Sequence, residues 1–147
     1  MSTTEAAETA ELLTQAKDAL ERYLEVHVDD DGALTFRHGE VPCVIQATRL
    51  GEGLTVLSLT CVVAWDLPDD PALSVAVAER AGAGLFGTLG VGHSGAGLDV
   101  TLRYAFPAAG LDVAALGTLL MLVVSTASQL RTELPGTSPG ETGANGG

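Results

Sequence analysis

The chain has 147 residues, a length typical of one domain with a single hydrophobic core. Its 19 acidic and 7 basic residues give a formal net charge of -12, and the lysines and arginines are scattered singly. This charge excludes nucleic acid and anionic membranes as expected partners, because both would be repelled at long range, and it favours basic or apolar partners.

The first predicted element is a helix from about Thr4 to Glu25. Apolar residues recur along one of its faces at helical spacing, and acidic residues occupy much of the remainder. The apolar positions are Leu12, Leu13, Ala16, Leu20, Tyr23 and Leu24. We expect this helix to cover other structure with one face and to meet water with the other.

The next segment is predicted to form four strands joined by short turns. Their expected ranges are Glu25–Val28, Ala33–Arg37, Val41–Leu50 and Leu54–Trp65. Each turn holds a glycine, and connections this short make neighbouring strands antiparallel. The longest strand offers apolar residues to both faces, with Val62 and Ala64 on one side and Cys61 and Val63 on the other. Such a sheet needs two covers, and the chain has helices enough for about one, so we expect a partner to supply the second.

A second helix is expected after the longest strand. Asp70 is a favourable capping residue, and Pro71 suits the first helical position. The helix is expected to end near Ala81, with Leu73 and Val77 on its apolar side. Two further strands are then predicted, joined by a glycine-rich hairpin that includes His93 and Ser94. Their expected ranges are Leu85–Val91 and Leu98–Phe106.

The last predicted helix runs from about Asp112, its expected cap, to Thr132. Its first 18 residues after the cap carry no charge, but their apolar side chains recur on one face, which predicts a buried amphipathic helix and not a membrane span. The opposite flank, which includes Ala115, Thr118 and Leu122, is also uncharged, and a solvated helix face usually carries charges. We therefore expect these three residues, together with Leu73 and Val77, to contact a second copy or a partner. The domain is predicted to span residues 1–133, and residues 134–147 form a Gly/Pro-rich tail that we expect to be disordered.

Two glycine motifs imitate catalytic sites without the context that the chemistry needs. The run Gly92–Gly95 resembles the start of the nucleophile elbow of hydrolases, but the fifth position is Ala96 and a strand is expected to follow, not a helix. The run Gly82–Gly87 spells a phosphate-binding pattern, yet it follows a helix and precedes a strand, which reverses the required arrangement. Neither motif predicts a reaction.

Metal ligation and cysteine chemistry are not expected either. The acidic run Asp29–Asp31 would put His38 where a calcium loop needs a bidentate glutamate, and the three histidines lie in separate segments. Cys43 and Cys61 sit in apolar strands without the spacing of a metal pair, so we expect two free, buried thiols. The sequence predicts no catalytic residue, no cofactor and no metal, and hence no enzyme. The acidic start of the chain lacks the features of a secretory signal, which predicts a cytoplasmic protein.

The order of elements resembles that of the YbjN-like family, which has the fold of the type III secretion chaperones. The segments that carry the resemblance are Val28–Gly32, Leu54–Val56, Trp65–Pro68, Asp99–Tyr104 and Phe106–Leu111. The resemblance implies an α+β domain in the order α-β-β-β-β-α-β-β-α, with an antiparallel sheet of five to six strands and three helices. It also implies a homodimer that binds polypeptides and has no enzymatic activity.

Two main functions remain open from the sequence, beside a purely structural role as a subunit of a larger assembly. The first is a dimeric protein- or peptide-binding module, chaperone-like or regulatory, which uses uncovered apolar surface. The second is a small-molecule-binding domain or enzyme with a pocket between sheet and helices, whose weakness is the lack of clustered titratable groups. A pocket that holds a histidine beside a carboxylate would favour the second function.

Overall fold

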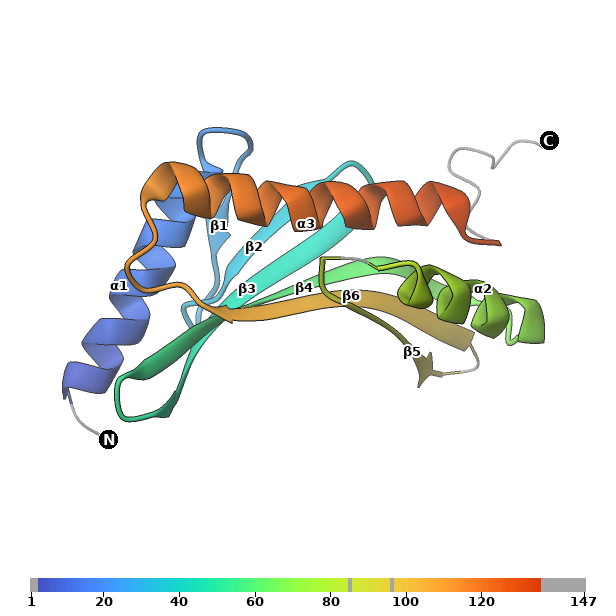
Figure 1. The fold of residues 1–147 in the computed structure, drawn as a ribbon, viewed down its shortest axis with the longest axis horizontal. Helices are drawn as coiled ribbons and strands as arrows, with labels where there is room; N and C mark the ends of the chain where they lie inside the picture. The colour runs from blue at the N-terminus through green and yellow to red at the C-terminus, as the bar shows by residue number, and fades with distance from the viewer. Residues whose placement is uncertain (1–2, 85, 96, 136–147) are drawn as a thin grey trace.

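A computed structural model describes residues 3–84, 86–95 and 97–135 of the chain. The elements are α1 (Thr3–Leu20), β1 (His27–Val28), β2 (Leu34–His38), β3 (Val41–Gly51), β4 (Leu54–Leu67), α2 (Pro71–Gly82), β5 (Thr88–Ser94), β6 (Gly97–Pro107) and α3 (Val113–Glu133). The predicted α+β class, with three helices and an antiparallel sheet in the stated order, is confirmed (Figure 1). The predicted tail lies outside the described residues from position 136 onward, whereas Leu134 is buried against the core.

The six strands form one antiparallel sheet in the order β1-β2-β3-β4-β6-β5. The first four strands are a meander, as the short turns predict. After β4 the chain passes through α2, forms the outer strand β5, and returns as β6 between β5 and β4. The long strand β4 is therefore central, and β5 is one edge of the sheet.

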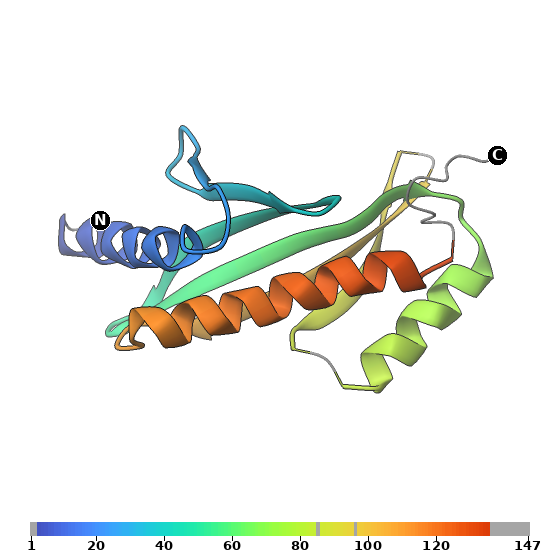
Figure 2. The same cartoon turned by 90° about the horizontal axis from the view of Figure 1, so that it is seen from above.

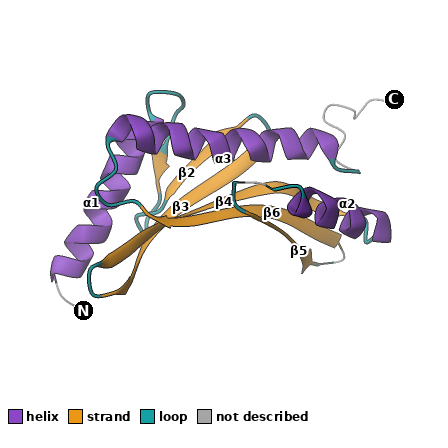
Figure 3. Cartoon of the chain, in the orientation of Figure 1, coloured by secondary structure: helices purple, strands orange, loops and turns teal. Residues whose placement is uncertain are grey.

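The helices cover one face of this sheet. Alternate strand residues, such as Leu57 and Leu59 in β4 and Val100 and Leu102 in β6, are fully buried on that face. Helix α1 contacts β3 and β4, α3 contacts β2, β3 and β4, and α2 contacts β5. Figure 2 shows α3 running along this side of the sheet, and Figure 3 separates the helices from the strands by colour. The opposite face has no helix over it among the described residues.

Helix α3 is the main cover of the core. It is long and apolar enough to cross a membrane by length and composition, but seven of its residues are buried inside the molecule. Gly117 lets α1 approach closely, because a Cβ at this position would lie 3.2 Å from the Ala19 carbonyl oxygen. Near the other end of α3, Ser128 Oγ donates to the His38 carbonyl oxygen at 3.1 Å and lies 2.5 Å from His38 Nδ1. Both contacts tie α3 to the α1 and β2 side of the fold.

Irregularities in β4 correct the predicted assignment of its apolar residues to the two faces. The pairing with β6 shifts between Val62 and Ala64 and again before Leu67. The first shift turns both Val63 and Ala64 into the buried core, so Ala64 does not share a face with Val62 as expected. At the second shift Asp66 adopts a positive φ of 57°, and its backbone N–H donates to Asp99 Oδ1 at 2.9 Å. The uncovered face consequently holds fewer apolar side chains than the sequence predicts.

Several predicted boundaries were wrong. Helix α1 ends at Leu20 and not at Glu25, because the following residues form a turn in which the Tyr23 and Leu24 N–H groups both bond to the Leu20 carbonyl. Strand β5 begins at Thr88, later than predicted, after a turn in which Gly87 has φ +108°. His93 and Ser94, predicted to lie in the hairpin, belong to β5. The helix caps were right: Asp70 and Asp112 each accept a hydrogen bond from a backbone N–H of the first turn.

Candidate functional site

The uncovered face of the sheet, called the open face below, is the broadest surface that the helices leave free. The strand register arranges its side chains in rows that cross the sheet. One row contains Thr35, Val44, Thr60, Arg103 and Thr88. Beside it lie Arg37, Pro42, Val62, Thr101 and Gly90. The open face therefore has a centre of valine, proline and threonine with an arginine on either side.

Two hollows adjoin one another on the open face. The first, of about 570 Å³, is bounded by Arg37, Val44 and Thr60 among others. The second, of about 420 Å³, lies over β5 and β6 and is bounded by Thr101 and Arg103. Thr60 pairs with Arg103 across the β4–β6 boundary, so the two hollows meet at the middle of the sheet. Their shape is that of a broad, shallow trough and not of an enclosed cavity.

A histidine does lie beside a carboxylate in the first hollow. His27 Nε2 is 4.0 Å from Glu25 Oε2, and the two side chains are 68% and 85% exposed. His93 Nε2 similarly lies 3.7 Å from Asp69 Oδ2, at the edge of the sheet and in water. Pairs this exposed are screened by solvent and are not oriented by further contacts. They do not make the desolvated site that general acid–base catalysis uses.

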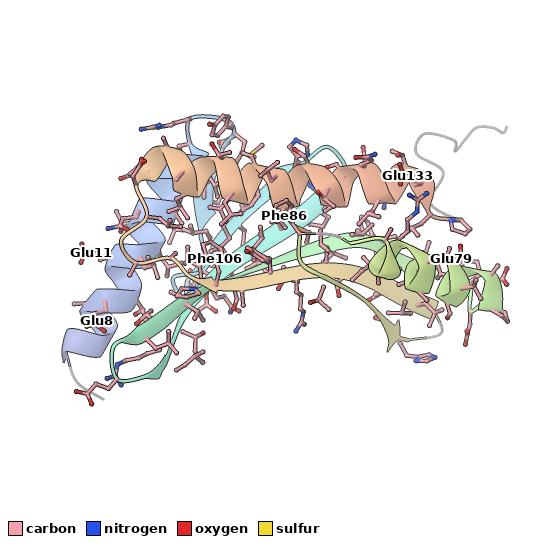
Figure 4. The ribbon with its side chains drawn as sticks, in the orientation of Figure 1. Glu8, Glu11, Glu79, Phe86, Phe106 and Glu133 are labelled. Carbon is pink, nitrogen blue, oxygen red and sulfur yellow. The ribbon has the colours of Figure 1, made fainter. Side chains whose placement is uncertain are left out.

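The carboxylates are dispersed over the rest of the molecule. Figure 4 shows Glu8 and Glu11 on α1 at one end, and Glu79 and Glu133 at the opposite end on α2 and α3. Glu8 faces Arg49 at 3.9 Å, and Glu133 bridges to Arg80 at 2.8 Å, which links α3 to α2. Within the described ranges, no group of three or more His, Cys, Asp or Glu side chains is placed to hold a metal ion.

The two cysteines face each other across β3 and β4. Cys43 and Cys61 are register partners, and both are buried free thiols. A hydrogen bond with Cys61, together with burial, raises the pKa of Cys43 above its usual range, so its thiol stays protonated at neutral pH. This arrangement is that of packing residues and not of a reactive pair.

We expect neither cysteine to react with an aromatic disulfide reagent while the chain is folded. Reaction needs a thiolate and access: both thiols are buried, and the pKa of Cys43 is raised by its hydrogen bond with Cys61 and by burial. At neutral pH, absorbance should show that the native protein releases almost no aromatic thiolate from the reagent. After denaturation, each chain should release two equivalents. Rapid native reaction of either thiol would contradict the packing of β3 on β4.

The predicted contact residues divide into two groups. Leu73 and Val77 lie on the buried side of α2 and are only 2% and 5% exposed, so they belong to the core of the chain. Ala115, Thr118 and Leu122 are exposed on the outer flank of α3, as their pattern predicts. Their role in a contact stays a prediction.

Other apolar side chains are exposed on the helical side. Val75 on α2, Leu122 on α3, and Phe86 in the α2–β5 connection are each about half exposed. Figure 4 labels Phe86 in this connection. Trp65 is also partly exposed at the end of β4, where the Arg131 guanidinium lies 5.1 Å from its ring centre. We call Val75, Phe86 and Leu122 the helical patch.

Arg37 and Arg103, the two arginines of the open face, were not predicted as site residues from the sequence. Thr35-Phe36-Arg37 in β2 and Thr101-Leu102-Arg103 in β6 share one pattern, in which a buried apolar residue separates two outward polar ones. This period of two could have marked both arginines as lying on the polar face of a strand. Their shared location depends on the strand order, which no local pattern gives.

Comparisons with known proteins agree with this architecture. One of the matching solved structures is the crystal structure of the ExsC–ExsE complex, with a TM-score of 0.59 and 19% sequence identity over 86% of this chain and 96% of that chain. This likeness confirms the secretion chaperone-like fold that the sequence predicted. No curated protein matches the chain. The model of the YbjN family, described as a putative bacterial sensory transduction regulator, matches residues 9–135, and the chain therefore belongs to the YbjN family.

Proposed function

We propose that this chain is a non-enzymatic, dimeric regulator of the cytoplasm that holds an extended polypeptide segment on the open face. The observation that carries the proposal is the one-sided cover of the sheet: the helices fill one face, and the other offers a trough the width of several strands. The description of the family as a regulator and the two-protein complex of the structural neighbour support protein binding.

The trough suits an extended chain better than a small molecule. Its walls are low and its residues come from all six strands, whereas sites for small ligands usually enclose most of the ligand surface. Its valine and threonine side chains offer both apolar contact and hydroxyl groups. These groups complement the alternating side chains and the backbone of a segment in extended form.

A random peptide library panned against the native protein tests this function. Enriched peptides should bind the native chain and lose binding to Thr60→Trp, which fills the trough at its middle. They should retain binding to Leu54→Glu, a change at an exposed position of the β3–β4 hairpin. If no peptide is enriched, while a screen of small metabolites raises the melting temperature of the native chain but not of Thr60→Trp, the small-molecule alternative replaces the proposal.

The helical patch is the proposed contact between two copies. Its exposed aromatic and aliphatic side chains are of the kinds found at the centres of protein interfaces. The uncharged flank of α3 extends this surface through Ala115 and Thr118. Because the patch and the open face lie on opposite sides of the sheet, association through the patch would leave the trough accessible.

Replacing Leu122 by glutamate is expected to weaken association without unfolding the chain. Leu122 is 45% exposed, so the charge meets water in a single copy but is buried between two. Light scattering over a dilution series should give the native protein twice the 15.0 kDa chain mass and shift the variant toward the single mass. Leu54→Glu, which adds the same charge far from α3, should keep the native mass. An unchanged mass for the Leu122 variant would place the interface elsewhere.

A further inference from the structure

The arginines of the open face are distributed in a defined way. The Thr-x-Arg segments of β2 and β6 lie three strands apart and run in opposite directions. Arg103 shares a row with Thr35, and Thr101 shares the neighbouring row with Arg37. The two arginines thus occupy opposite corners of a four-sided frame, and the two threonines occupy the other corners. Val44, Thr60 and Val62 lie inside the frame.

These arginines differ in their surroundings from most of the other cations of the chain, although Arg22, in the turn after α1, is also exposed. Lys17, Arg49 and Arg80 each face a glutamate, and Arg131 lies on Trp65. Arg37 bonds only to the Glu40 carbonyl oxygen, at 3.2 Å, and within the described residues neither Arg37 nor Arg103 has a carboxylate within 4.0 Å. Although the chain has 19 acidic residues, two exposed guanidinium groups over one trough thus form no ion pair with a carboxylate of the described residues.

The acidic groups around the trough lie at its margins. Glu25 borders the first hollow and Asp99 the second. Asp99 already accepts the Asp66 N–H at 2.9 Å. A negatively charged group over the frame would therefore lie between Arg37 and Arg103 at the two diagonal corners. The carboxylates of Glu25 and Asp99 lie only at the margins of the trough. Such an arrangement attracts an anion locally and repels one placed elsewhere on this acidic chain.

We propose that the open face selects an acidic segment in extended form, with one carboxylate on Arg37 and another on Arg103. This inference rests on the proposed function, because it names the chemistry of the polypeptide that the trough holds. Three strand spacings separate the arginine backbones by about 14 Å, and the diagonal offset makes the distance about 16 Å. An extended chain rises about 3.3 Å per residue, so residues four apart lie about 13 Å from each other and project to the same side. Glutamate and arginine side chains span the remaining gap, and a small apolar residue between the two acids would lie over Val44 and Val62.

A fluorescent nine-residue peptide of valine and threonine, with glutamate at its third and seventh positions, is a direct probe. We expect it to bind the full chain, and an otherwise identical peptide with glutamine at both positions to bind about 10- to 100-fold more weakly, as for loss of charge-assisted hydrogen bonds. Fluorescence anisotropy should also show weaker binding of the glutamate peptide as salt concentration rises. Equal binding of the two peptides at low salt would overturn the acidic specificity but leave the proposed function standing.

Substitutions of the arginines assign the site. Arg37→Gln and Arg103→Gln should each weaken binding of the glutamate peptide by about tenfold or more. Binding of the glutamine peptide should not change. Arg22→Gln removes the same charge from an exposed position beyond α1 and should leave both affinities unchanged. The double variant Arg37→Glu and Arg103→Glu should prefer a peptide with lysine at the third and seventh positions. Circular dichroism confirms that each variant is folded.

Two results would overturn the inference. One is a loss of affinity for the glutamate peptide that is no greater in the Arg37 and Arg103 variants than in Arg22→Gln. This result would mean that the peptide binds elsewhere. The other is a fall in solution mass on Arg37→Gln or Arg103→Gln in the absence of peptide, which would mean that a second copy occupies the open face. If Thr60→Trp leaves binding of every peptide unchanged, the proposed function itself fails at this surface.

Discussion

Replacing Leu120 by alanine is expected to lower the free energy of unfolding by about 3 kcal/mol, within the range of large-to-small changes in protein cores. Leu120 is fully buried in the middle of α3, the helix that covers β2, β3 and β4. Its loss leaves a cavity between helix and sheet that rigid neighbours on both sides can fill only in part. Urea denaturation, analysed with a common slope for native and variant chains, measures the change.

The matched control lies two residues further along the same helix. Leu122→Ala removes the same atoms from a side chain that is 45% exposed, so we expect a change below about 1 kcal/mol in a dissociated sample. The comparison must use a dilution at which light scattering gives the single-chain mass, because association would add to the stability of the native protein. Equal losses at the two positions would mean that α3 does not pack as described.

Gly97→Ala is expected to destabilise the fold by about 2–3 kcal/mol, because the new methyl group has no space. A Cβ at position 97 would lie 2.9 Å from both Asp66 Oδ1 and the Leu67 carbonyl oxygen. The carbonyl belongs to the backbone of β4 at the irregularity where Asp66 has a positive φ, so it can move only if the β4–β6 pairing is disturbed. Thermal and urea unfolding should both show the loss.

Gly92→Ala in the neighbouring strand β5 is the control for that change. Nothing lies within 4 Å of a Cβ at this position. Alanine there restricts the unfolded chain more than glycine does, so the stability should stay the same or rise by up to about 1 kcal/mol. If Gly97→Ala were as well tolerated as Gly92→Ala, the close approach of β6 to β4 would be wrong.

The fold could be predicted from sequence because local signals agree with one another. Asp70 and Asp112 mark helix starts, short glycine turns make a meander, and apolar periodicity identifies α3 as a core helix. The end of α1 could not be predicted, because no glycine or proline closely follows Leu20 and the apolar pattern continues to Leu24. The faces of β4 could not be assigned either, because a bulge reverses the alternation at Ala64 without any mark in the sequence.

The candidate site was less accessible to prediction than the fold. The apolar surface of α2 predicts Leu73 and Val77 as contact residues, but both are buried in the core, and Val75 is the exposed apolar residue of this helix. Arg37 and Arg103 are 66 positions apart in sequence, and only the insertion of β6 between β4 and β5 brings them to one face. A pattern confined to one strand carries no information about such long-range placement.

The position of β4 also determines when the molecule can fold. One edge of this strand pairs with β3, which is synthesised before β4. The other edge pairs with β6, which is synthesised only after α2 and β5. Helix α3, one of the two helices that contact β4, comes later still. A nascent chain that ends before Gly97 therefore presents a central strand with one unpaired edge and a core that α3 does not yet cover, both of which favour aggregation. Folding of this domain is in this way tied to the synthesis of α3, which closes the structure.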